Sequence, residues 1–291
     1  MVRNDRPPRP HPGGHRRRGS GHAGRRRLCG AGPGRAPDGS WWILDGPKKR
    51  LAHFSASGSY LGAVAVPTEY LTNGQYFQYQ LPRVLDDGAL VASRLGGDST
   101  TLLRLDGGDL SLVTIPANVG VRTDDGTTLY GFGVGDDGER DVLTAVDPET
   151  GEASTVDWFR TRAGTRYRVE INNGLLRIEL PDSPDRRTLV FRLALAGKPQ
   201  LPAHALVEVA SGDDGTLFLY LIGGTDTGEG GQLAGLLTIS PDGVASPVEP
   251  TPNPFTTADP GSPAHLGVRP GTSKPTLMII GTDGVRVFAK S

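Results

Sequence analysis

The segment DGSWWILDGPKKRLAHFSASGSYLGAV, residues 38–64, contains three apolar runs separated by turns that carry glycine. The runs 41–45, 50–54 and 60–64 have the length of β-strands, and Asp-Gly and Ser-Gly pairs are typical of hairpin turns. The whole chain is rich in such residues, with 42 Gly and 24 Pro among 291 residues. No segment combines a helical spacing of apolar residues with helix caps. The sequence therefore predicts an all-β protein.

Hairpin turns of the same kind recur along the chain. Asp-Asp-Gly or Asn-Asn-Gly occurs at 86–88, 124–126, 172–174 and 213–215. The spacing is roughly 40 to 50 residues, which is the period of a four-stranded propeller blade. The turns thus predict a repeat architecture with one blade for each interval.

A second repeat supports this period. The segments PANVGVR from Pro116, PAHALVEV from Pro202 and PAHLGVR from Pro263 share Pro-Ala, then Asn or His, then Val three positions later. The interval from Pro116 to Pro202 is 86 residues, which corresponds to two blades. The repeat therefore marks equivalent positions in different blades.

The predicted fold is a β-propeller of four-stranded antiparallel blades, with six blades expected and five or seven as alternatives. The expected blades are 38–69, 74–115, 116–161, 162–201, 202–262 and 263–291. The last blade supplies only three strands and is incomplete in this chain, and the first blade lacks an innermost strand. A closed ring would take its missing strand from the N-terminal part of the chain.

The opening segment also resembles a known repeat. Asp38-Gly39, the strand WWILD, Arg50 within KRLAHFSASG, and YLGAV are similar to the NHL repeat over about residues 38–62. GVRVF at 284–288 is a weaker match of the same kind. This resemblance implies a propeller whose binding face lies at one mouth of the central channel.

Residues 1–36 differ in composition from residues 37–291, the predicted propeller domain. They contain ten Arg, no Lys and one acidic residue, Asp5. Too few apolar residues are present to offset the entropy of ordering, so we expect an Arg/Gly/Pro-rich disordered tail. A start codon assigned too early is one explanation of such a tail, and a basic binding arm is another.

Targeting and redox signals are sparse. No apolar region follows the arginines, so the sequence as given shows no signal peptide, and a secreted or cell-envelope location would require a different start. No apolar run is long enough to span a membrane. The single cysteine, Cys29, excludes an internal disulfide.

Motifs that would define an enzyme are missing or ambiguous. GVGDDG at 133–138 matches G-x-G-x-x-G, but a strand follows it instead of a helix, so it is interpreted as a hairpin. No nucleophile elbow, Walker A motif or H-E-x-x-H motif occurs, and the Asp-Gly turns lack calcium-loop spacing. We therefore predict no catalytic residue, no metal site and no cofactor.

The Pro-Ala repeat nevertheless makes three polar residues equivalent: Asn118, His204 and His265. Each should begin an innermost strand, so the three are expected near one mouth of the channel. They could contact a ligand there, act as acid and base, or satisfy neighbouring backbone groups.

Aromatic and Arg residues are concentrated in connections expected between blades. The segment 70–80 supplies Tyr76 and Tyr79, and the segment 157–168 supplies Trp158, Arg160 and Arg162. Aromatic rings beside guanidinium groups are effective binding elements. Together with 251–262, these connections predict one ligand-binding concavity on the face that carries the inter-blade loops, while hairpins such as 147–151 should be inert.

Two classes of function remain. The first is a non-catalytic binding or scaffold propeller that recognises a small sugar-like, aromatic or anionic ligand, or a protein partner. The alternative is a propeller hydrolase, lactonase or lyase that acts at the central channel. A body charge near −10 argues against a nucleic-acid partner, and a monomer is expected.

Overall fold

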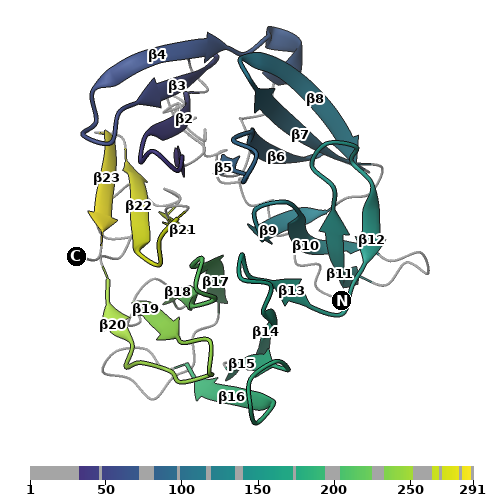
Figure 1. Cartoon of the computed structure of the whole chain (residues 1–291), viewed down its shortest axis with the longest axis vertical. Coiled ribbons are helices and arrows are strands. Elements are labelled where there is room, and N and C mark those ends of the chain that lie inside the picture. Colours follow the sequence, from purple (N-terminus) through teal and green to yellow (C-terminus); the bar gives the residue numbers. More distant parts are fainter. Residues whose placement is uncertain are drawn as a thin grey trace, which may run out of the picture.

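The computed structural model describes residues 33–45, 48–71, 82–96, 99–115, 119–134, 140–172, 175–193, 204–224, 233–251, 264–268, 271–281 and 284–289. Within these ranges the protein is all-β, apart from one short 3₁₀ helix, Thr68–Leu71. Figure 1 shows the sheets arranged as a ring, with the first strand of each sheet near the centre, the region that we call the channel, and the last strand at the periphery. No described helix is long or apolar enough to cross a membrane.

Each blade is an antiparallel meander whose strands follow one another in sequence order. Blade 1 consists of β1 (Pro33–Arg35), β2 (Trp41–Asp45), β3 (Arg50–Phe54) and β4 (Tyr60–Ala65). Blade 2 consists of β5 (Arg83–Val84), β6 (Leu90–Gly96), β7 (Ser99–Asp106) and β8 (Asp109–Ile115). Blade 3 consists of β9 (Gly120–Asp124), β10 (Leu129–Val134), β11 (Arg140–Val146) and β12 (Ala153–Thr155).

The second half of the ring continues the pattern. Blade 4 consists of β13 (Phe159–Arg160), β14 (Arg166–Asn172), β15 (Leu175–Leu180) and β16 (Arg187–Arg192). Blade 5 consists of β17 (His204–Ser211), β18 (Leu217–Gly224), β19 (Leu233–Ile239) and β20 (Glu249–Pro250). A last sheet contains β21 (Ala264–Val268), β22 (Pro275–Gly281) and β23 (Gly284–Ala289).

The number of blades is lower than predicted. Among the described residues, five sheets have four strands and the sheet β21–β23 has three. Six four-stranded blades are therefore not present, because no described segment lies beside β23 as an outermost strand. The three-stranded sheet occupies the place in the ring between blade 5 and blade 1 (Figure 1).

The start of the ring also differs from the prediction. The first blade does not lack its innermost strand, since β1 pairs with β2 through Pro33–Ile43 and Arg35–Trp41. These residues lie inside the range 1–36 that the sequence predicted as a tail. Composition alone misled the prediction there, because a short innermost strand needs few apolar side chains when other blades surround it.

The Asp-Gly motifs at 38–39, 86–88, 124–126 and 213–215 lie between the first and second strands of blades, whereas Asn172 ends the second strand of blade 4, so the predicted turn at 172–174 is not equivalent to them. In three of them the Asp carboxylate accepts a hydrogen bond from the backbone N–H two residues later: Asp38 to Ser40 at 2.8 Å, Asp87 to Ala89 at 2.8 Å, and Asp214 to Thr216 at 2.9 Å. The following glycines have φ values of 84° to 85°, a left-handed conformation that favours glycine. We call the end of the channel where these turns lie the hairpin end.

Apolar side chains between neighbouring blades form the core. Blades 1 and 2 share a cluster that includes Leu44, Leu51, Leu90 and Leu103, and blade 5 packs on the last sheet through Tyr220 and Leu277, among others. Blade 4 directs Leu176, Ile178 and Leu180 into a cluster shared with blade 5. Burial of this apolar surface is the main stabilising contribution to the ring.

Candidate functional site

A large groove lies beside the junction of blades 3 and 4. Its volume is about 980 Å³, which is at the upper end of the range for small-molecule sites. It is lined by Thr127, Thr128, Tyr130, Ala145, Val146, Asp147, Glu152, Ala153, Ser154, Val156, Asp157, Trp158, Arg160 and Arg166. The residues from Thr127 to Val156 belong to blade 3 or directly follow it. Asp157 and Trp158 lie in the connection to blade 4, and Arg160 and Arg166 lie on blade 4.

Short strands at the junction account for the groove. The outermost strand of blade 3, β12, pairs only with Thr144–Val146 of β11, and the innermost strand of blade 4, β13, has two residues. Val156 then donates to the carbonyl of Leu143 at 2.9 Å, and the chain enters blade 4. The two blades consequently meet along a short contact near the channel and leave space farther out.

An aromatic cluster forms that short contact. The ring of Phe159 is 2% exposed and lies edge-on to Tyr130 and Phe132 of blade 3, with centroid distances of 6.2 and 5.6 Å. It also packs at 5.4 Å against Tyr167, which is fully buried. Because side chains alternate along a strand, burial of Phe159 directs its neighbours Trp158 and Arg160 to the other side, into the groove.

Several lining side chains are held by other residues. The Tyr130 hydroxyl donates to Asp125 at 2.6 Å, and burial together with this carboxylate raises the pKa of the phenol. Arg166 donates from Nε and Nη2 to Asp182, at 3.0 and 2.5 Å to Oδ1. This ion pair lowers the pKa of Asp182. These groups form rigid walls.

Four other lining side chains are not held by a hydrogen bond, an ion pair or a ring contact among the described residues. Within the part of the chain that the structure describes, no hydrogen bond or ion pair involves the side chains of Glu152, Asp157 or Arg160, and no ring contact involves Trp158. Trp158 is half-buried and the three charged residues are exposed. The groove thus presents an aromatic ring, one guanidinium and two carboxylates to a ligand.

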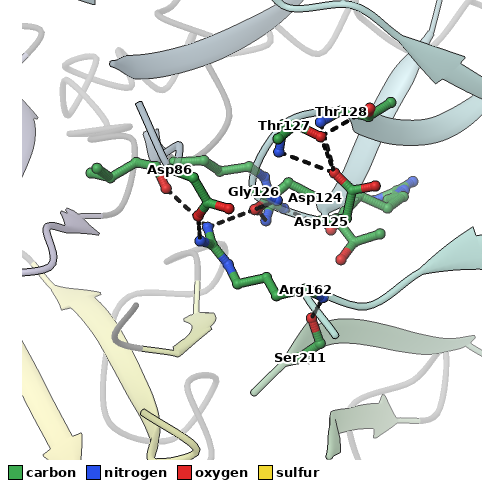
Figure 2. Close-up of polar contacts among 12 residues, drawn as sticks. Asp86, Asp124, Asp125, Gly126, Thr127, Thr128, Arg162 and Ser211 are labelled. Atoms are coloured by element: carbon green, nitrogen blue, oxygen red, sulfur yellow. Dashed lines mark hydrogen bonds and ion pairs between the residues drawn. The ribbon is translucent and has the colours of Figure 1, made fainter. Parts of the chain in front are cut away.

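The channel itself has a second polar cluster at its hairpin end. Arg162, in the turn between β13 and β14, donates from Nη2 to Asp124 at 2.9 Å and to the Val84 carbonyl at 3.0 Å, and it pairs through Nη1 with Asp86. Asp124 also accepts from Arg83 at 3.1 Å. Figure 2 shows Arg162 extending across the channel toward Asp86 and Asp124. Charged groups of blades 2, 3 and 4 are therefore joined.

A small cavity adjoins this cluster. It has a volume of about 60 Å³, and its polar lining consists of Arg35, Arg83, Thr123, Asp124, Arg162, Ser211 and Thr276. Six of these residues lie on the first strand of a sheet or within two residues of one, and Thr276 lies on β22. Since Arg83 and Arg162 are already paired with carboxylates, the cluster fastens the blades together and leaves little room for a ligand.

The structure distributes the predicted site residues over several places. Trp158 and Arg160 lie together in the groove, whereas Arg162 lies in the channel. The segment 157–168 was predicted to be a connection between blades, and this prediction is wrong. The segment contains β13, a hairpin turn and the start of β14. Arg162 therefore reaches the hairpin end and cannot share a concavity on the inter-blade face.

The remaining predicted residues are placed only in part. His204 begins β17 and His265 is the second residue of β21, so both stand at the start of a first strand as predicted. Tyr76, Tyr79 and Asn118 lie outside the described residues, as do most of 70–80 and 251–262. Asp157 and Arg166 belong to the predicted segment 157–168, but the sequence did not indicate Tyr130 or Glu152 as lining residues, because the packing of blade 3 on blade 4 brings them beside Trp158.

Metal-binding groups are not evident. Among the described residues no three His, Cys, Asp or Glu side chains come together in a way that could hold a metal ion. The hairpin at 147–151, predicted to be inert, contributes Asp147 to the lining of the groove, and its inertness stays a prediction.

A family model described as a domain of unknown function, DUF7485, matches residues 20–290. The chain belongs to this family. The match begins within the range predicted as a tail, which agrees with the presence of β1 in the DUF7485 domain. The resemblance of residues 38–62 to the NHL repeat stays a prediction. A search of curated proteins gives no significant match.

Several solved structures are similar to the DUF7485 domain. Regucalcin, a calcium-binding protein from Agrobacterium tumefaciens, is 16% identical with a TM-score of 0.46, covering 86% of this chain and 82% of that chain. A gluconolactonase from Xanthomonas campestris is 13% identical with a TM-score of 0.42, covering 90% and 86%. Virginiamycin B lyase from Staphylococcus aureus is 11% identical with a TM-score of 0.41, covering 90% and 84%.

Proposed function

We propose that the protein is a binding propeller that holds a small molecule in the groove between blades 3 and 4. One observation supports this most strongly: Trp158 and Arg160 line the same groove, and among the described residues neither side chain makes a hydrogen bond, an ion pair or a ring contact. Trp, Tyr and Arg supply most of the binding energy at protein surfaces. This function is the first of the two predicted from the sequence. The proposed binding site is the groove and no longer a concavity on the inter-blade face.

The arrangement of the groove supports binding in a fixed geometry. Phe159 anchors the strand that carries Arg160, and the Tyr130–Asp125 hydrogen bond fixes the opposite wall. A ligand that enters would lose its own freedom while the protein walls lose little, which reduces the entropic cost of binding.

The experiment is a ligand-observed NMR screen of a fragment library against the full chain, followed by affinity measurements on variants. Trp158→Ala and Arg160→Ala should each weaken the hits about tenfold or more, as expected for anchor residues. Arg192→Ala is the matched control, because Arg192 is an exposed guanidinium on β16 outside the groove. Circular dichroism verifies that each variant is folded.

Two results would overturn the proposal. One is a set of hits whose affinities ignore both groove substitutions, and the other is a screen without hits. The similar structures named as lactonase and lyase correspond to the alternative function, hydrolase, lactonase or lyase, so the wild type is also incubated with a panel of lactones and esters. Turnover that Asp124→Asn abolishes and Trp158→Ala leaves unchanged would place the activity in the channel and favour that alternative.

A further inference from the structure

The groove contains opposite charges that do not pair with one another. Arg160 is the cation, and Glu152 and Asp157 are the anions. No ion pair joins Arg160 to either carboxylate within the described residues. Exposed ion pairs add little to stability, so the absence of a pair costs the protein little and leaves all three charged groups available to a ligand.

The other charged groups of the groove are occupied. Arg166 is bound by Asp182 through two nitrogen atoms. Asp147 accepts the backbone N–H groups of Glu149 and Thr150 at 2.7 and 3.0 Å, and these two hydrogen bonds lower its pKa. Only Arg160, Glu152 and Asp157 remain available to pair with charges of a ligand.

An apolar surface lies in the same groove. Trp158 and Tyr130 contribute rings, and Ala145 and Val156 contribute aliphatic surface. Aromatic rings bury apolar groups well and attract organic cations through their faces. The groove therefore combines one positive group, two negative groups and an apolar wall.

We propose that the groove takes a small zwitterion with an apolar or aromatic side group, the chemistry of a free amino acid or a short peptide. Its carboxylate pairs with Arg160, its ammonium group pairs with Asp157 and Glu152, and its side group packs on Trp158. This inference rests on the proposed function, since it names the ligand class of the same groove. A purely anionic ligand would leave Asp157 and Glu152 unpaired, and an uncharged ligand would leave all three charged groups unpaired.

The test uses three probes that differ by one charge: phenylalanine, 3-phenylpropionate, which lacks the ammonium group, and phenethylamine, which lacks the carboxylate. Affinities are measured by chemical-shift titration of the full chain. Phenylalanine should bind about tenfold more tightly than either analogue, because each analogue lacks one charge-assisted hydrogen bond and such a bond increases affinity by about this factor. Arg160→Ala should remove its advantage over phenethylamine only.

The double variant Glu152→Gln with Asp157→Asn should remove the advantage of phenylalanine over 3-phenylpropionate only. Arg192→Ala should change neither. Equal affinities for the three probes, all weakened by Trp158→Ala, would contradict the zwitterion and leave the proposed function intact. Binding that Trp158→Ala does not affect would contradict both, and so would absence of binding by all three probes together with a fragment screen without hits.

Binding of only one analogue gives a further outcome. If 3-phenylpropionate binds as tightly as phenylalanine and Arg160→Ala weakens both, the ligand class is anionic and the zwitterion is wrong. If the shifts caused by phenylalanine lie outside the groove, the zwitterion is likewise wrong for this site.

Discussion

Blade 3 packs differently against its two neighbours, blade 2 and blade 4. At the junction with blade 2, buried residues of both blades form one cluster that includes Leu85, Leu102, Val121 and Leu129. Thr100 adds a reciprocal pair of hydrogen bonds with Val119, at 3.0 and 2.8 Å. At the junction with blade 4, Phe159 and Tyr167 of that blade join Tyr130 of blade 3 in a buried cluster near the channel, and the groove lies beside it.

The difference shows how a ring of similar blades produces one distinctive surface. Blade 4 buries one face against blade 5 and carries charged residues on the other. Arg168 pairs with Glu170 there at 2.8 Å, and Arg177 pairs with Glu179 at 2.5 Å. Such a face is stable in water without a neighbouring blade, so the junction can remain open where a ligand would enter.

The largest effect is expected at the aromatic contact. Phe159→Ala should lower the free energy of unfolding by about 4 kcal/mol, because the side chain is buried and its removal leaves a cavity. Hydrogen exchange should become faster across blade 4. The measurement is urea unfolding combined with amide exchange.

The tightly packed junction supplies the control for this change. Leu102→Ala should cost about 3 kcal/mol, since Leu102 is completely buried between blades 2 and 3. It should leave amide exchange in blade 4 unchanged relative to the wild type when both are compared at equal stability. Faster exchange in blade 4 in both variants would mean that the two junctions do not differ.

A somewhat smaller effect is expected in the channel. Asp124→Asn should cost about 3 kcal/mol, because Arg83 and Arg162 lose a carboxylate of which only 10% is exposed. Asp86→Asn should cost less, since the Asp86 side chain is 54% exposed. Equal losses in thermal or urea unfolding would show that the channel cluster does not fasten the blades.

The smallest effect concerns Asp87 in the turn of blade 2. Burial opposes its ionisation, but hydrogen bonds from the Ala89 N–H and from Arg104 outweigh it and place its pKa below the ordinary value of 3.8. Ionised Asp87 therefore stabilises the fold above about pH 3.8, and this contribution is lost as pH falls through the lower folded pKa. Asp87→Asn should cost about 1 kcal/mol at pH 7.

The pH dependence of stability shows whether the charge of Asp87 contributes. The difference in unfolding free energy between wild type and Asp87→Asn should decrease steadily below pH 3.8. A difference that stays constant between pH 7 and pH 3 would mean that the carboxylate charge does not contribute.

The sequence predicted four-stranded antiparallel blades, although not their number, because the signals of strands and turns are local. Asp87-Gly88 and Asp214-Gly215 encode turns through a side-chain hydrogen bond and a positive φ, and both requirements are visible in two adjacent letters. Alternating apolar residues then identify the strands between them. The innermost strand β1 was missed because Pro33–Arg35 has neither signal.

The groove could not be predicted in the same way. Trp158 and Arg160 were selected for their chemistry, but their location depends on where β12 ends and β13 begins. Those limits follow from the burial of Phe159 against blade 3. There it contacts Tyr130 and Phe132, which are distant from it in sequence. Arg162 was assigned to the wrong surface for the same reason, since the turn that carries it was read as a connection.

The most direct test of the binding groove is an amide map of a bound ligand. A hit from the fragment screen is titrated into isotopically labelled protein, and the perturbed amides are assigned. A ligand in the groove should shift the amides of Thr127, Thr128 and Tyr130 of blade 3 and those of Trp158 and Arg160 beside blade 4. Shifts restricted to Arg83, Asp124 and Arg162 would place the ligand in the channel and contradict it.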